Sequence, residues 1–115
     1  MRPSVLIVDD HADFRASARA LLELQGFSVV GDVVDGEAAL EAAARLRPDV
    51  VLLDVQLPGI DGFEVAERLA AADDPPRVVL ISSRDRSAYD RLHGAPVAGF
   101  LGKHELSGAA LADLL

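Results

Sequence analysis

Five polar residues with complementary chemistry each stand at the end of a short apolar run. They are two adjacent carboxylates, a third carboxylate, a hydroxyl and an ammonium group: Asp9, Asp10, Asp54, Ser82 and Lys103. Three carboxylates brought together repel one another and raise one another's pKa unless a cation lies among them. Carboxylate oxygens without imidazole or thiolate favour Mg²⁺, which keeps several waters and is often completed by a phosphate. The residue types therefore predict a magnesium site that also receives a phosphoryl group.

Phosphoryl transfer requires a protein mainly to position the reactants and to neutralise charge. Lys103 could neutralise one phosphoryl oxygen, and the Ser82 hydroxyl could bond another. A carboxylate can itself be the nucleophile and form an acyl phosphate, and Asp54, central among the strand ends, is the candidate. Each residue taken alone has a simpler interpretation as a helix cap, a turn residue or a solvated side chain. Only their convergence at one edge indicates a site.

The apolar runs predict the elements that would bring these residues together. They are of strand length, rich in β-branched residues and mostly apolar throughout, which is typical of strands covered on both faces: residues 5–8, 28–30, 50–53, 78–81 and 97–101. Apolar stripes between them predict helices near residues 14–22, 40–44 and 63–69, with weaker patterns at 87–92 and 107–115. Asp35 and Ser107 are candidate N-caps. Repeated strand-helix units predict an α/β fold with a doubly wound parallel sheet, in which ligands bind at the carboxyl ends of the strands.

The composition limits the alternatives. The chain has 115 residues, of which 50% are hydrophobic, and it has no cysteine, so we expect one domain over residues 1–115 without disulfides or thiolate metal ligands. The first apolar run is too short for a signal peptide or a membrane span, so we expect a cytoplasmic domain without membrane contact. A formal net charge of −8 disfavours direct contact with nucleic acid.

Four stretches, in this order and spacing, resemble the receiver domain of bacterial response regulators over essentially the whole chain: VLIVDDHADFR, PDVVLLDVQLPGIDGFEV, VVLISS and GFLGK. The first and third stretches are most similar to the subgroup whose members often carry a LuxR-type helix-turn-helix domain after the receiver. The resemblance implies a flavodoxin-like sandwich with the strand order 2-1-3-4-5. It also implies a phosphoacceptor domain of two-component signal transduction and not an enzyme.

The resemblance gives the acidic residues separate roles. Asp54 would accept a phosphoryl group from the phosphohistidine of a sensor histidine kinase or phosphotransfer protein. Asp10 would bind Mg²⁺ directly and Asp9 through water. Asp54 and the backbone carbonyl of Gln56 would complete the protein's share of the metal ligands.

The remaining implied roles concern the phosphoryl group and a change of shape. Ser82 and Lys103 would contact phosphoryl oxygens. After phosphorylation the Ser82 hydroxyl would move inward and Phe100 on the fifth strand would follow it, which changes the face formed by the fourth helix, the fifth strand and the fifth helix. That face commonly supports homodimers in the family, so the resemblance implies a homodimer as a candidate assembly.

Some positions depart from the family pattern or vary within it. His104 follows Lys103 at a position where the family usually has proline, often after a cis peptide. A cis bond before a non-proline residue costs roughly 2.5–4 kcal/mol. We therefore expect a trans peptide and a less firmly held Lys103. His11 follows the aspartate pair, and because an oxygen-lined Mg²⁺ site does not need it, we expect it on the surface of the first helical turn. Gln56 and Arg84 stand where the family tunes hydrolysis of the acyl phosphate, but the sequence gives no rate.

Three other classes of protein are alternatives to this resemblance. A P-loop ATPase would need an earlier glycine before Gly102 and Lys103, and His104 stands where that motif has serine or threonine. An aspartyl phosphatase of the haloacid dehalogenase type would need a D-x-D arrangement after the first strand, which DDHAD does not supply. A receiver that only binds proteins remains open. The sequence is compatible with a stand-alone receiver and with a fragment of a longer DNA-binding regulator, and it identifies neither the kinase nor the pathway.

Overall fold

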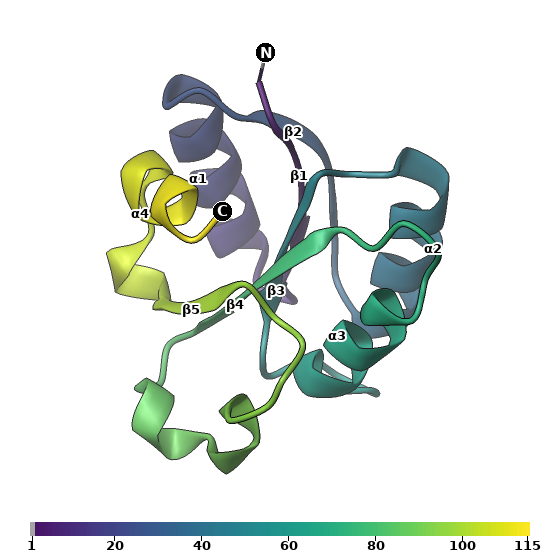
Figure 1. The fold of residues 1–115 in the computed structure, drawn as a ribbon. Coiled ribbons are helices and arrows are strands. Elements are labelled where there is room, and N and C mark those ends of the chain that lie inside the picture. The colour runs from purple at the N-terminus through teal and green to yellow at the C-terminus, as the bar shows by residue number, and fades with distance from the viewer. Residues whose placement is uncertain (1) are drawn as a thin grey trace.

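The computed structural model describes residues 2–115 and contains one five-stranded parallel sheet (Figure 1). The strand order is β2-β1-β3-β4-β5, which confirms the predicted order. The strands are β1 (Ser4–Val8), β2 (Ser28–Val33), β3 (Val50–Asp54), β4 (Arg77–Ser82) and β5 (Gly99–Gly102). The α-helices are α1 (Ala12–Leu24), α2 (Gly36–Leu46), α3 (Gly62–Ala70) and α4 (Gly108–Asp113), and single 3₁₀ turns are η1 (Arg86–Ala88), η2 (Asp90–Leu92) and η3 (Lys103–Glu105).

Helices cover both faces of the sheet, which explains why the central strands are apolar throughout. Helices α1 and α4 lie on one face, and α2 and α3 lie on the other (Figure 1). Every residue of β3 is buried, including its last residue, Asp54. Side chains that alternate along a strand enter the two cores in turn, so Leu52 packs with α1 and Leu53 packs with α2 and α3.

Side chains cap three of the α-helices. Asp35 accepts a hydrogen bond from the backbone N–H of Ala38 at 2.8 Å, and Ser107 accepts one from Ala110 at 3.0 Å, which confirms both predicted N-caps. Asp61 caps α3 in the same way. These caps fix where α2, α3 and α4 begin, immediately after the loops at the carboxyl edge of the sheet.

The connection between β4 and β5 differs from the prediction. We expected a fourth α-helix near residues 87–92, but the chain forms only the 3₁₀ turns η1 and η2, and neither turn contains a buried residue. Most of the segment is polar, and it offers no apolar stripe at helical spacing that could pack on the sheet. The predicted helical repeat is therefore wrong at this position. We call residues 83–98 the β4–β5 segment.

Several element boundaries also differ from the prediction. β2 continues to Val33, and β5 begins at Gly99 because the N–H of Val97 is bonded to Ala95 within a turn. The last helix is shorter than residues 107–115 and ends at Asp113. In the part of the chain that the structure describes, no helix combines the length and apolar character needed to cross a bilayer.

Gly62 allows α3 to begin directly against the end of β3. A Cβ atom at this position would collide with the carbonyl oxygen of Asp54 and would lie 2.8 Å from the Cα of Val55. The N–H of Gly62 also donates to the carbonyl of Val55 at 2.9 Å. Because the obstructing atoms are backbone, the clash has no cheap relief, so this glycine fixes the backbone that carries Asp54.

We expect Gly62→Ala to lower the free energy of unfolding by about 1–3 kcal/mol, the usual cost of overpacking a tight site. The matched control is Gly31→Ala, where the added Cβ would meet only the methyl ends of Leu46 and Leu6, at 3.1 and 3.4 Å. Urea unfolding of both variants measures the difference. Equal losses would show that the β3–α3 junction is not the constraint described here.

Candidate functional site

Asp9, Asp54 and Lys103 meet at the carboxyl edge of the sheet. Asp9 follows β1, Asp54 ends β3, and Lys103 follows β5. The ammonium of Lys103 lies 2.6 Å from Asp9 Oδ2 and 3.3 Å from Asp54 Oδ2. Both carboxylates are buried, whereas Lys103 is 17% exposed. Three predicted site residues from three strand ends therefore form one charged cluster.

The two side-chain oxygens of Asp9 have different partners. Its Oδ1 accepts hydrogen bonds from the backbone N–H of His11 at 2.8 Å, and it lies 3.0 Å from His11 Nδ1. Arg15 fixes the backbone by donating to the carbonyl of Asp9 at 2.8 Å. The buried Oδ2 faces the ammonium of Lys103, at 2.6 Å. Oδ2 is thus already paired with a cation, so a metal ion would share this oxygen with Lys103.

Asp10 and His11 complete a group of possible metal ligands. One ligand atom from each of Asp9, Asp10, His11 and Asp54 lies within 4.8 Å of all the others. The side chain of His11 is 68% exposed, as expected for first-turn surface, yet its Nδ1 lies 3.2 Å from Asp10 Oδ1 as well as near Asp9. The ring therefore contacts both carboxylates, a role that sequence reasoning missed.

The charges in this cluster change one another's ionisation. Burial, followed by the negative charge of Asp9, raises the pKa of Asp54 to about 6, although the N–H of Gln56 and the ammonium of Lys103 act in the opposite direction. Burial works to lower the pKa of Lys103, but the hydrogen bond and charge of Asp9 and Asp54 outweigh it, so the pKa of Lys103 is raised. Asp54 is thus the strained group, and the lysine is held charged.

Ser82 and Phe100 lie near this edge but have other partners. The buried Ser82 Oγ is 2.7 Å from the hydroxyl of Tyr89, and it accepts a hydrogen bond from the N–H of Arg84 at 2.9 Å. The ring of Phe100 is buried and packs against Tyr89, with centroids 6.1 Å apart. Gln56 is exposed, and its N–H donates to Asp54 Oδ1 at 3.1 Å.

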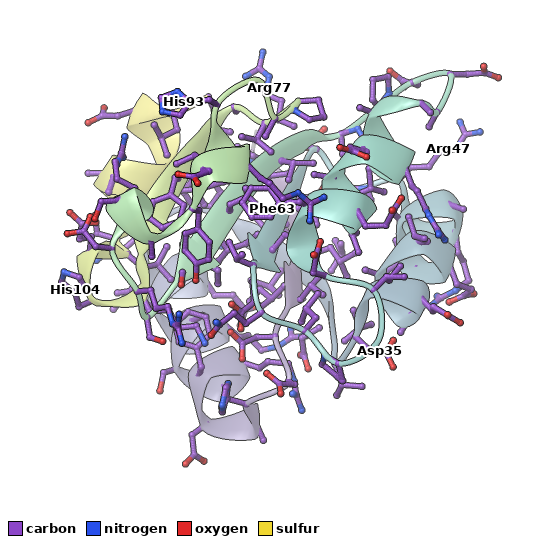
Figure 2. The ribbon with its side chains drawn as sticks, turned by 90° about the horizontal axis from the view of Figure 1, so that it is seen from below. Asp35, Arg47, Phe63, Arg77, His93 and His104 are labelled. Atoms are coloured by element: carbon purple, nitrogen blue, oxygen red, sulfur yellow. The ribbon has the colours of Figure 1, made fainter. Side chains whose placement is uncertain are left out.

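Two groups support Lys103 and its loop. The ammonium lies 4.6 Å from the centroid of the Phe14 ring, within the range of a cation–π interaction. Glu105 accepts a hydrogen bond from the N–H of Gly102 at 2.8 Å, which fixes the turn η3 that begins at Lys103. The peptide before His104 is trans, as expected, since no cis bond occurs in the described residues. The exposed side chain of His104 lies on this edge of the molecule (Figure 2).

Sequence reasoning missed the partners of the site rather than its charged residues. Tyr89, Phe14 and Glu105 contact Ser82, Lys103 and the turn beside it, but none follows a strand. Tyr89 lies in a polar stretch without periodic pattern, seven residues after Ser82. No local signal indicates which side chain its hydroxyl will reach.

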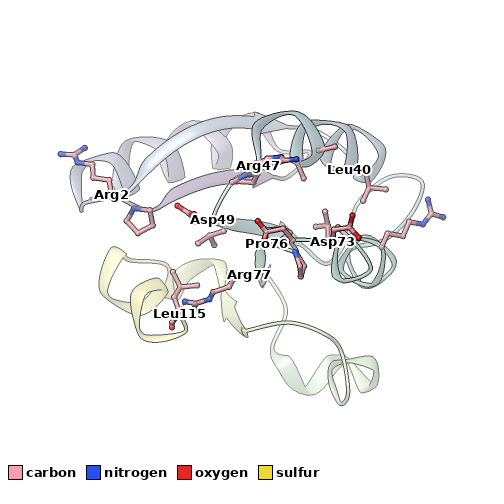
Figure 3. Close-up of a pocket in the computed structure, with 18 residues that line it drawn as sticks. Arg2, Leu40, Arg47, Asp49, Asp73, Pro76, Arg77 and Leu115 are labelled. Atoms are coloured by element: carbon pink, nitrogen blue, oxygen red, sulfur yellow. Dashed lines mark hydrogen bonds between the residues drawn. The ribbon is translucent and has the colours of Figure 1, made fainter.

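The opposite edge of the sheet carries a hollow but no comparable cluster among the described residues. The hollow has a volume of roughly 810 Å³ and opens beside Arg47, Pro76 and Arg77 (Figure 3). None of the predicted site residues lines it. The size of a hollow therefore does not identify the functional site. The convergence of charged residues at the strand ends identifies it.

Comparison with known proteins identifies the family. Residues 5–111 match the family described as the response regulator receiver domain. The chain belongs to this family. It is accordingly a receiver domain of the response regulators of two-component systems, and the resemblance read from the sequence is confirmed.

Curated relatives include regulators of transcription. The chain is 38% identical over 106 residues to the virulence factors putative positive transcription regulator BvgA of Bordetella pertussis, covering 91% of this chain and 51% of the relative. It is 44% identical over 100 residues to the probable transcriptional regulatory protein NarL of Mycobacterium tuberculosis, covering 84% of this chain and 46% of the relative. The chain thus spans about half the length of the curated relatives it matches.

Solved receiver structures share the fold over nearly the whole chain. The receiver domain of the putative response regulator NarL from Mycobacterium tuberculosis has a TM-score of 0.85 and 39% identity, covering 98% of this chain and 96% of that one. The chemotaxis response regulator CheY4 of Vibrio cholerae has a TM-score of 0.88 at 23% identity, with full coverage of both chains. The second likeness concerns the fold alone.

We expect Asp54→Asn to stabilise the metal-free domain at neutral and higher pH. The folded-state pKa of Asp54, about 6, exceeds its ordinary value of 3.8. Ionisation of Asp54 is therefore less favourable in the folded state than in the unfolded state. The free energy of unfolding falls as the pH rises from about 4 to about 6. The variant escapes this loss, which is on the order of 2–3 kcal/mol. Thermal unfolding with a chelator should show a higher Tm for the variant at pH 8 and a shrinking difference below pH 6.

The control for this prediction is Asp73→Asn, because Asp73 is exposed and lies far from the cluster. Its Tm should follow that of the unchanged protein throughout. If Asp54→Asn melts at a lower temperature than the unchanged protein at pH 8, the carboxylate cluster is not strained.

Proposed function

We propose that this domain accepts a phosphoryl group on Asp54 from a phosphohistidine and changes shape in response. The observation that carries the proposal is the position of Asp54, a buried carboxylate 3.3 Å from the ammonium of Lys103 and next to Asp9, at the edge where this fold binds ligands. The donor is the phosphohistidine of a sensor histidine kinase or phosphotransfer protein. A domain that works with such a donor acts in the cytoplasm.

The transfer makes one bond and breaks one. An oxygen of the ionised Asp54 carboxylate attacks phosphorus, the P–N bond of the phosphohistidine breaks, and the imidazole leaves and takes up a proton. A pKa of about 6 keeps Asp54 largely ionised above neutral pH, so no separate base is required. Lys103 is held charged by the two carboxylates, so it can neutralise the negative charge of the transferred group.

Mg²⁺ fits the residues present. Asp9, Asp10 and Asp54, with the backbone carbonyl of Gln56, would hold it, and the closeness of one ligand atom from each of these carboxylates, within 4.8 Å of the others, supports this assignment. Oxygen ligands are what Mg²⁺ prefers, so His11 remains a neighbour and not a required ligand. When bound, the ion neutralises charge on the phosphoryl oxygens.

The response involves Ser82, Lys103 and Phe100. Lys103 would move from its closer partner, Asp9, toward a phosphoryl oxygen, and the Ser82 hydroxyl would bond another. Phe100 would then follow Ser82 inward. The face that changes consists of the β4–β5 segment, β5 and α4, since this chain has no α-helix between β4 and β5. This face is the candidate for a homodimer.

The output of the domain is proposed to be the control of transcription. The curated relatives BvgA and NarL are named as regulators of transcription and are about twice as long as the matched region. An acidic receiver need not itself touch DNA, and its altered face would act on a partner or on a further domain. A receiver that binds proteins without being phosphorylated is the competing function, and labelling decides between the two.

We expect incubation with acetyl phosphate and Mg²⁺ to add one phosphoryl group to the domain, seen as an increase in intact mass. Asp54→Asn should show no increase, whereas Asp73→Asn should be labelled like the unchanged protein because its carboxylate is outside the site. A phosphoryl group retained on the Asp54 variant, or none on the unchanged domain, would exclude Asp54 as the acceptor.

We expect Asp10→Asn to weaken Mg²⁺ binding by roughly tenfold or more. Even the loss of a residue that only hydrogen-bonds to a metal ligand often lowers metal affinity by that factor. Asp13→Asn is the matched control, since Asp13 is an exposed carboxylate in the first turn of α1 and is not part of the ligand group. Calorimetric titration with MgCl₂ measures both. An unchanged affinity for the Asp10 variant would remove Asp10 from the ligand set.

A further inference from the structure

Tyr89 connects the two residues that the proposed change of shape requires to move together. Its hydroxyl lies 2.7 Å from Ser82 Oγ, and its ring packs against the ring of Phe100 with centroids 6.1 Å apart. The same ring also packs against Phe63 of α3, at 5.9 Å. Tyr89 thus stands in contact with the hydroxyl at the site and with the aromatic residue of the output face.

Tyr89 and two arginines attach the β4–β5 segment to aromatic residues of the core. Tyr89 lies between η1 and η2, and neither turn contains a buried residue. Arg91 lies over the ring of Phe63 at 4.8 Å, and Arg86 lies over the ring of Phe100 at 5.6 Å. The segment is therefore held by aromatic and cation–π contacts and by the partly buried side chains of Leu92, Ala95 and Val97, in place of the apolar face of a helix. In the view from below, Phe63 lies centrally among the side chains (Figure 2).

The hydroxyl of Ser82 can occupy one position at a time, which makes Tyr89 and a phosphoryl group compete for it. Either hydroxyl can be the donor in the bond between Ser82 and Tyr89, and Ser82 Oγ also accepts the N–H of Arg84. A phosphoryl oxygen is only an acceptor, so it must receive the hydrogen of the Ser82 hydroxyl. When Ser82 turns toward Asp54 to donate this hydrogen, its hydroxyl turns away from Tyr89.

We propose that Tyr89 is a positioning residue that holds Ser82 in the unphosphorylated state and releases the β4–β5 segment when Ser82 turns to the phosphoryl group. This inference rests on the proposed function of Asp54 and Ser82. It adds a competitor for the Ser82 hydroxyl, and it makes the movement of Phe100 depend on the displacement of the Tyr89 ring. The bond that is lost opposes phosphorylation and favours the resting shape.

The first experiment tests the contact without phosphorylation. Tyr89 is the only tyrosine of a chain without tryptophan, so its fluorescence reports this contact alone. In Ser82→Ala, Tyr89 loses its partner, and acrylamide should quench its fluorescence more strongly while amide exchange in the β4–β5 segment speeds up about 2- to 10-fold. The control is Ser83→Ala, which removes the neighbouring exposed hydroxyl and should change neither measurement. If quenching and exchange are equal in Ser82→Ala and the unchanged protein, the bond between Ser82 and Tyr89 does not restrain the β4–β5 segment.

The second experiment tests the coupling to the site. Tyr89→Phe keeps the ring contacts and removes only the hydroxyl, so Ser82 is free to bond the phosphoryl group. The variant should bind beryllofluoride with Mg²⁺, a mimic of the acyl phosphate, about 2- to 10-fold more tightly in calorimetric titrations. In the unchanged protein, beryllofluoride should increase acrylamide quenching of Tyr89.

The outcomes separate the two proposals. If the unchanged protein binds no beryllofluoride and takes no phosphoryl group, the proposed function fails and the coupling fails with it. If it binds beryllofluoride but Tyr89→Phe binds equally well or more weakly, the coupling alone is overturned. Unfolding by urea checks that Tyr89→Phe remains folded, so that an altered affinity is not the result of a lost fold.

Discussion

The structure depends on one electrostatic arrangement, the burial of Asp9 and Asp54 around the single ammonium of Lys103. Lys103 lies 2.6 Å from one carboxylate and 3.3 Å from the other, so one positive charge serves two negative ones. The deficit appears in Asp54, whose pKa burial and Asp9 raise to about 6. A site with unbalanced negative charge is stabilised by whatever cation enters it, which links the fold directly to metal binding and phosphoryl chemistry.

The parallel sheet makes this crowding unavoidable. Carboxyl ends of parallel strands lie at one edge, so the residues that follow β1, β3 and β5 must converge there. Gly62 then presses the start of α3 against the backbone of Asp54, which keeps the carboxylate from moving away from its neighbours. The strain is therefore maintained by the backbone, and we expect rearrangement in side chains and in the β4–β5 segment, whose turns η1 and η2 contain no buried residue.

That segment is where this chain departs from the alternation of strand and α-helix found in the rest of the fold. A helix at this position would bury an apolar face against the sheet, but here Tyr89, Arg86 and Arg91 contact aromatic residues of the core instead. Polar and aromatic contacts are individually small, so such a segment is easier to displace than a packed helix. The hydroxyl of Ser82 and the ring of Phe100 are consequently joined through one side chain, that of Tyr89.

The sequence by itself determined the strands, three of the four α-helices and the charged residues at the strand ends. The order of the strands followed from the resemblance to the family. The elements and their charged ends follow from hydrophobic periodicity and from the fixed geometry of parallel sheets, both of which are local or general. Only the tertiary structure decided that Lys103 lies closer to Asp9 than to Asp54, that His11 contacts both aspartates of its own turn, and that Ser82 is bonded to Tyr89. Such pairings depend on differences of an ångström between distant segments, and no short-range pattern encodes them.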